Sequence, residues 1–163
     1  VFIGNFAGAM TTAFFMSFIL TYGYSADGGV IAAKVSHIGE ARTLGYQTHG
    51  IGGWFTIFIR GMLCNWMVSM GVVGAMISTS AGAKMAAMWM PVMLFFYMGF
   101  EHSIVNMFLF PFSMIMGGDF TVYDYLLWNE VPTVLGNLAG GLLLVGLPLY
   151  LTHVKTSPNR KIS

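Results

Sequence analysis

The chain has 163 residues, of which 56% are hydrophobic and only 8% are charged, and its mean hydropathy is +0.74. A soluble domain carries roughly 25% charged residues, so this composition excludes an ordinary soluble protein and indicates an integral membrane protein with the lipid bilayer as its surroundings. The net charge of +1 excludes a broad basic surface for nucleic acid, and the single cysteine excludes an internal disulfide framework.

Four apolar spans follow one another along the chain, at residues 1–22, 54–77, 85–116 and 131–153. Roughly 20 apolar helical residues cross a bilayer, so the first, second and fourth spans are each about one membrane thickness long. The third holds about 32 residues, or roughly 48 Å as a helix, which is too long for one straight crossing. The chain begins inside an apolar segment without an initiator methionine, which predicts a fragment of a longer protein.

The connecting segments predict the orientation of these spans. Residues 23–53 form a mixed polar connector with an expected short helix at 31–44, and residues 117–130 form an acidic loop. Positive charges favour the cytoplasmic side, which places Lys84 and the basic tail 154–163 inside. We therefore expect a single, partial transmembrane domain in the plasma membrane, with a cytoplasmic C-terminus.

A short pattern of small residues and asparagine occurs near the start of both the first and the fourth span. Its copies are Gly4, Asn5 and Gly8, and Gly136, Asn137 and Gly140. Such GxxxG steps let helices approach closely, and the asparagine can bond across the interface. Small residues are common in membrane helices, so one short match also arises by chance. If it marks a repeat, the unit has three helices, two units are inverted in the membrane, and two helices precede residue 1.

Glu101 and His102 lie in the middle of the third span, which has no other acidic or basic side chain. An ionisable group at that depth costs on the order of 2.5–3.5 kcal/mol unless it is paired or hydrated. This cost favours a pathway for ions or protons; the alternative is a pair that only holds helices together. An unperturbed histidine titrates near pH 6.5, so His102 can attract a small anion or give it a proton.

Helical spacing places Phe95, Gly99, His102 and Asn106 on one face, because they are separated by four, three and four residues. We expect this face to line the pathway, with Phe95 as an aromatic plug. Glu101 points roughly 100° away and is expected to fix the backbone or a partner helix. Pro91 and Pro111, together with Gly99, favour a helix broken near residue 99, and such unwound backbone is tolerated where it lines a cavity.

Asn65 interrupts the apolar second span and needs a hydrogen-bond partner in lipid. His102 is one candidate, and an ordinary interhelical bond is the other. Val68 shares the face of Asn65, where it lines the pathway or simply packs. Catalytic motifs and metal-ligand spacings are absent from the sequence, so we expect no enzyme, no metal site and no cofactor.

Three stretches resemble the formate/nitrite transporter family in order and spacing: residues 61–68 (GMLCNWMV), 99–108 (GFEHSIVNMF) and 129–137 (NEVPTVLGN). The pattern GFEHSxxNM is highly specific. The resemblance implies an all-α, aquaporin-like inverted-repeat bundle of six membrane helices, of which this chain holds about four. It also implies a homopentamer with one pore in each protomer.

The resemblance assigns His102 as the central pore histidine, Asn65 as its amide partner and Glu101 as a structural acid, with Phe95 and Val68 where the pore narrows. A lysine that the family often carries before the fourth helix is replaced by His49, and the family's second helix precedes this chain. We expect a channel or proton-linked transporter for small monovalent anions, with nitrite favoured, as in eukaryotic, fungal-like members, and formate next. The alternative is a non-transporting membrane assembly subunit whose buried polar residues only hold helices together.

Overall fold

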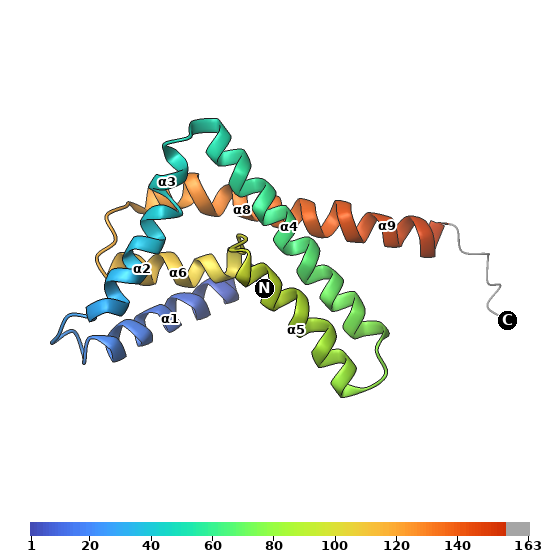
Figure 1. The fold of residues 1–163 in the computed structure, drawn as a ribbon, viewed down its shortest axis with the longest axis horizontal. Coiled ribbons are helices and arrows are strands. Elements are labelled where there is room, and N and C mark those ends of the chain that lie inside the picture. Colours follow the sequence, from blue (N-terminus) through green and yellow to red (C-terminus); the bar gives the residue numbers. More distant parts are fainter. Residues whose placement is uncertain (156–163) are drawn as a thin grey trace.

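The computed structural model describes residues 1–155, and all of its regular structure is helical (Figure 1). The first part comprises α1 (Phe2–Leu20), α2 (Gly29–Ala41), α3 (Leu44–Gln47) and the long α4 (Gly50–Ile77). It is followed by α5 (Ala81–Tyr97) and α6 (Ser103–Ile115). A last continuous helical run joins α7 (Val122–Tyr125), η1 (Leu126–Glu130), α8 (Val131–Gly141), η2 (Leu142–Gly146), α9 (Leu147–Leu149) and η3 (Tyr150–Lys155), where η marks a π-helical turn. Residues 156–163 of the predicted tail lie outside the described residues.

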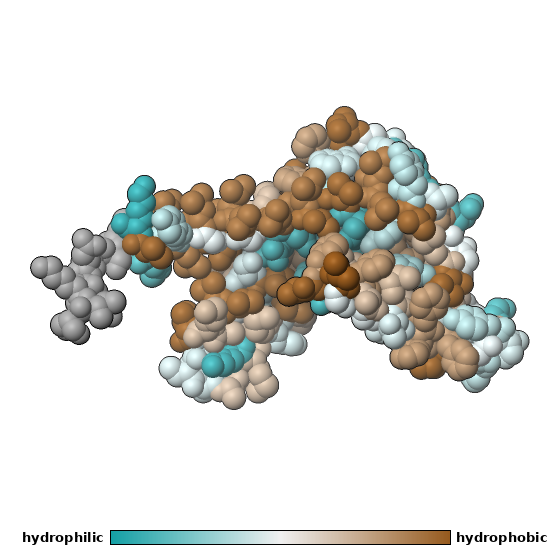
Figure 2. All heavy atoms as spheres, turned by 180° about the vertical axis from the view of Figure 1, so that it is seen from behind, coloured by the Kyte–Doolittle hydropathy of each residue, from teal (hydrophilic) through white to brown (hydrophobic). Residues whose placement is uncertain are grey.

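Three of the described helical segments are long and apolar enough to cross a membrane: Phe2–Leu20, Gly50–Ile77 and Val122–Lys155. Much of their apolar surface faces outward rather than into a core, as the brown side chains in Figure 2 show. Leu138 and Leu142, for example, are 56% and 57% exposed. A helix that is apolar on its outer face suits a lipid solvent, since the core of a bilayer is as apolar as leucine itself.

The third predicted span is divided between α5 and α6. The helix stops at Tyr97 in a Schellman arrangement, in which the N–H of Phe100 donates to the carbonyl of Phe95 and Gly99 has a positive φ of 63°. Pro91 and Pro111 lie inside α5 and α6. The left-handed glycine, and not a proline, therefore ends the first half, because a side chain at this φ would be strained.

The predicted loop at residues 117–130 is a shorter connection than expected, because the last helix begins at Val122. A capping box starts it. The Thr121 hydroxyl accepts from the N–H of Asp124 at 3.1 Å, and the Asp124 carboxylate accepts from the N–H of Thr121 at 2.9 Å. Asp124 was one of the acidic residues that indicated a loop. In the structure it marks the start of a helix, because its carboxylate satisfies the backbone N–H of Thr121.

A backbone-to-backbone helix contact joins α4 to α8 at the second copy of the small-residue pattern. A Cβ built on Gly136 would overlap the carbonyl oxygen of Phe58, and one on Gly140 would overlap that of Met62. The first copy differs, because Gly4 and Gly8 have no heavy atom within 4 Å of the same position. Of the two copies of the pattern, the second has its glycines packed against another helix, and the first does not within the described residues.

Replacement of Gly140 by leucine should separate α8 from α4 and lower the stability of the fold. Overpacked sites typically lose about 1–3 kcal/mol, and a backbone-to-backbone contact leaves little room for relaxation. The measurement is the midpoint of thermal unfolding of the detergent-solubilised protein, followed by tryptophan fluorescence. Gly52→Leu in α4 is the matched control, because nothing lies within 4 Å of a Cβ there. Equal midpoints for the two variants would contradict this packing.

Candidate functional site: the break between α5 and α6

Two arginine side chains converge on one backbone carbonyl at the break. Arg42, at the end of α2, donates from Nη2 to the carbonyl of Gly99 at 3.1 Å. Arg60, in α4, donates from Nη2 to the same oxygen at 2.7 Å. The carbonyl has lost its helical partner because the chain turns at Gly99, so the guanidinium groups replace the missing donor.

The guanidinium of Arg60 also lies over the ring of Tyr46, with 6.0 Å between its central carbon and the ring centroid. Burial raises the pKa of the Tyr46 phenol above its ordinary value, and the positive charge of Arg60 lowers it by less. The ring is therefore neutral and offers its face to the cation. This contact adds to the hydrogen bond that holds Arg60 at the break.

Glu101 is completely buried and compensates the positive charge. Its carboxylate lies 3.5 Å from Nε of Arg42, and the side-chain amides of Asn106 and Asn129 donate to it at 3.0 and 3.3 Å. Asn129 also donates to the backbone carbonyl of Arg42 at 3.0 Å. The acid thus ties α6, η1 and the end of α2 to the break, as a bracing role requires.

Asn137 of α8 satisfies the backbone on both sides of His102. Its Nδ2 donates to the carbonyls of Glu101 and Gly61, each at 2.9 Å. Its Oδ1 accepts from the N–H of Ser103, the first residue of α6, at 3.1 Å. One amide thereby caps the start of α6 and holds it against α4 and α8.

His102 stands apart from this network. Its backbone is extended, and its ring stacks on Phe95 with 5.7 Å between the ring centroids. The Nδ1 atom is buried and has no hydrogen-bond partner among the described residues. Such an orphaned buried nitrogen can bind a water molecule or a ligand, because it would otherwise forfeit a hydrogen bond.

The structure corrects two expectations about asparagines. Asn65 does not pair with His102: its Nδ2 donates to the carbonyl of Asn137 at 2.6 Å, so it is an interhelical tie. Asn106 is completely buried, and its Nδ2 donates to Glu101 and Asn129, so this amide is part of the bracing network. The expected common face fails because the helix is interrupted between Phe95 and Asn106. Val68, half-buried in α4, follows Asn65 by one turn.

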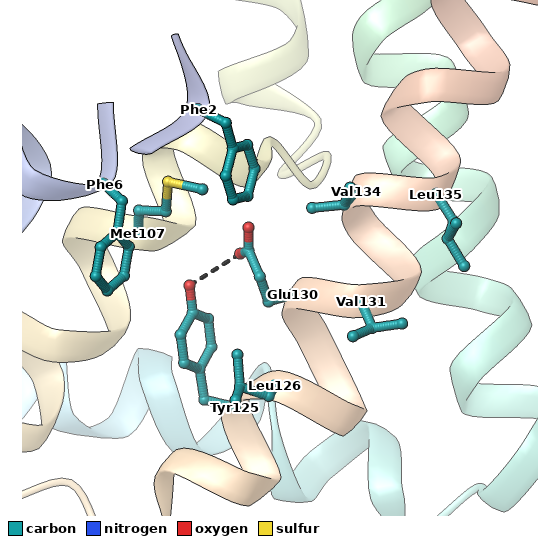
Figure 3. Close-up of a pocket in the computed structure, with 9 residues that line it drawn as sticks. All are labelled: Phe2, Phe6, Met107, Tyr125, Leu126, Glu130, Val131, Val134 and Leu135. Atoms are coloured by element: carbon teal, nitrogen blue, oxygen red, sulfur yellow. Dashed lines mark hydrogen bonds between the residues drawn. The ribbon is translucent and has the colours of Figure 1, made fainter. Parts of the chain in front are cut away.

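The sequence predicted no site role for several residues that form contacts in this region, namely Arg42, Arg60, Ser103, Tyr125, Asn129 and Glu130. Ser103 and Tyr125 both donate to the carboxyl group of Glu130, at 2.5 and 2.9 Å. This acid borders a cavity of about 350 Å³ lined mostly by apolar side chains, including Phe2 and Phe6 (Figure 3). The signal available for Asn129 and Glu130 was that two adjacent polar residues precede Pro132 at the start of an apolar span. Within residues 1–155 no cluster of three metal-binding side chains occurs.

Comparison with known proteins identifies the family. The family described as "Formate/nitrite transporter" matches residues 1–151. The "Probable formate transporter" of Methanothermobacter thermautotrophicus is 33% identical, covering 93% of this chain and 56% of that protein. "Formate channel FocA" of Haemophilus influenzae is 29% identical, covering 93% of this chain and 57% of that protein. The chain thus spans little more than half the length of these relatives.

A solved structure, described as "Pentameric formate channel with formate bound", superposes with a TM-score of 0.73 at 26% identity. The match covers 93% of this chain and 63% of that one. The predicted all-helical membrane fold is thereby confirmed. The chain belongs to the formate/nitrite transporter family.

Proposed function

We propose that the natural protein containing this chain carries small monovalent anions across a membrane, with nitrite favoured and formate as the next candidate. His102 is the residue that attracts the anion or gives it a proton. The observation that carries this proposal is the isolation of His102: it lies at the helix break, and its buried Nδ1 has no partner among the described residues. Arg60, Glu101 and Asn106 also have one buried side-chain atom without a hydrogen-bond partner, but each of them bonds the scaffold through its other atoms. The side chain of His102 forms no hydrogen bond to another residue among residues 1–155.

The charges around the break support an anion rather than a cation as the substrate. Arg42 and Arg60 bring two positive charges to the Gly99 carbonyl, and Glu101 brings one negative charge. The excess is positive, and in a low-dielectric site it acts over a longer distance than in water. A protonated His102 adds to it. An anion that takes a proton from the imidazolium of His102 becomes the neutral weak acid and crosses the apolar zones in that form, which leaves a neutral imidazole behind.

The proposed protein is a homopentamer with one path per protomer, in the plasma membrane and with its C-terminus in the cytoplasm. The similar solved structure is of a pentameric channel with formate bound, which supports this assembly. The apolar outer surface of the described helices suits both lipid and neighbouring protomers (Figure 2). Val68 and Phe95 narrow the path in this proposal, and Phe95 lies against the ring of His102. The activity is transport and not an enzymatic reaction.

A second candidate is a membrane subunit that assembles but does not transport. The network of Glu101, Asn106, Asn129 and Asn137 favours it, since these side chains hold four segments together. A change at His102 discriminates between the two candidates, because the Nδ1 of His102 forms no hydrogen bond with that network. Transport therefore predicts a histidine that is essential for flux and dispensable for assembly.

Replacement of His102 by phenylalanine should reduce nitrite and formate flux to the level of empty liposomes and leave assembly intact. Phenylalanine keeps the ring against Phe95 and removes the nitrogens. Flux is measured with the complete natural protein in liposomes, and assembly by size-exclusion chromatography. His37→Phe on the exposed side of α2 is the control and should match the wild type. Undiminished flux in the His102 variant would refute its assigned role.

Replacement of Glu101 by glutamine should act on stability rather than on the anion directly. The change leaves Arg42 without its buried counter-charge, and breaking such a pair costs about 3–5 kcal/mol. We expect a lower midpoint of thermal unfolding and a lower yield of assembled protein. Glu40→Gln is the matched control, since Glu40 accepts from the backbone N–H of Asp119 and forms no ion pair within the described residues. A wild-type midpoint for the Glu101 variant would show that the pair does not brace the fold.

A further inference from the structure

A second buried acid, Glu130, bonds to Ser103 at the start of α6 and has no part in the transport function proposed above. Glu130 is the last residue of η1 and is 6% exposed. Its Oε1 accepts from the hydroxyl of Ser103 at 2.5 Å, and its Oε2 accepts from the hydroxyl of Tyr125 at 2.9 Å. The same carboxyl group borders the apolar cavity between α1, α6 and α8 (Figure 3).

The two buried acids of this region differ in their compensation. Glu101 has the guanidinium of Arg42 at 3.5 Å, whereas Glu130 has no cation within ion-pair distance among residues 1–155. The charged residue that interacts electrostatically with Glu130 is Glu101, and its charge has the same sign. An ionised Glu130 would thus be a second, uncompensated negative charge in a low-dielectric region, which is costly.

The other surroundings of Glu130 offer no charge. Among the described residues, Tyr125 of α7 is the titratable side chain that bonds to it. From α1, α6 and α8 the cavity is lined by apolar residues, which are Phe2, Phe6, Met107, Val131, Val134 and Leu135. The cavity wall therefore neither neutralises nor hydrates a carboxylate through a side chain.

The hydrogen bonds of Glu130 are compatible with a bound proton. A protonated carboxyl group donates one hydrogen bond and still accepts others, and a hydroxyl group can donate or accept. Ser103 and Tyr125 can therefore keep both contacts whether or not the proton is present. Gain or loss of one proton requires only rotation of hydroxyl hydrogens, with no movement of heavy atoms.

Ser103 connects this acid to the proposed anion path. It follows His102 directly, and its N–H is fixed by Asn137 at 3.1 Å. We propose that Glu130 is a proton-binding site that controls anion flux. With its proton, Glu130 is neutral and the positive excess of Arg42 and Arg60 over Glu101 attracts anions. Without the proton, the second negative charge cancels that excess and the attraction is lost. The step is the transfer of one proton between the Glu130 carboxyl group and water, and no other bond forms or breaks.

The control of flux rests on the proposed transport function and is tested by the pH profile of Glu130→Gln. Glutamine imitates the neutral acid, so the variant should retain its flux at alkaline pH while wild-type flux declines. The quantity to compare is the ratio of variant to wild-type flux in liposomes, which should rise several-fold from the acidic to the alkaline end. This ratio cancels the titration of nitrite or formate itself. Glu40→Gln should give a constant ratio, and a constant ratio for Glu130→Gln would overturn the proposal.

Infrared difference spectroscopy between acidic and alkaline pH tests the proton without any transport. Above about pH 5.5, where exposed carboxyl groups with pKa values of about 4 stay ionised, the carbonyl stretch of a protonated carboxylic acid should be present in the wild type and in Glu40→Gln, and missing in Glu130→Gln. If that band persists in Glu130→Gln, Glu130 is not the proton site. If the wild type carries no anion, the proposed function fails, and the band still decides whether Glu130 binds a proton.

Tyr125→Phe provides a second variant should Glu130→Gln fail to assemble. It removes one hydroxyl contact and keeps the aromatic ring, which stacks on Phe110 with 4.7 Å between the ring centroids. The frequency of the carboxyl band and the midpoint of the pH profile should both shift. An unchanged band together with an unchanged midpoint would overturn the proposal.

Discussion

The structure depends on satisfying the backbone groups left open where α5 ends and α6 begins. The core of a bilayer has no water to bond such groups, and each one left open costs several kcal/mol. Here two guanidinium groups bond the carbonyl of Gly99, and the side chain of Asn137 bonds the N–H of Ser103. Side chains from α4, α8 and the end of α2 thus take the place of water. The positions of those helices follow from this need, because each must reach the break.

The interruption also sends three consecutive side chains to three different surroundings. Glu101 enters the charged network, His102 lies against Phe95, and Ser103 bonds to Glu130. In a continuous helix, neighbours are about 100° apart and all three would share the packing of one helix. Because the backbone at His102 is extended, Glu101 belongs to the bracing network while the next residue, His102, does not. A stable network can therefore stand next to an imidazole nitrogen that is left open.

Features set by a local sequence pattern could be predicted, whereas contacts between residues far apart in the chain could not. The apolar helices and the break beside Gly99 follow from composition and spacing. The placement of Asn106 was wrong because the 3.6-residue period applies only within an unbroken helix. Arg42 bonds a carbonyl 57 positions away, and no local pattern announces such a contact. For Asn65 the sequence left two partners open, His102 and an ordinary interhelical bond, because a lone buried amide shows the need for a hydrogen bond but not which group supplies it; the structure has the interhelical bond.

Two acids with the same side chain thus meet opposite conditions a short distance apart in one fold. Glu101 contacts a guanidinium and two amides, and these contacts make the acid part of the scaffold. Glu130 has two hydroxyls that tolerate either protonation state and a cavity wall that stabilises neither charge nor hydration. Arg42 pairs with Glu101 and Arg60 bonds the carbonyl of Gly99, and among residues 1–155 no cation lies within ion-pair distance of Glu130. This difference in compensation is the reason for assigning the two acids different parts, Glu101 to the scaffold and Glu130 to the proposed proton site.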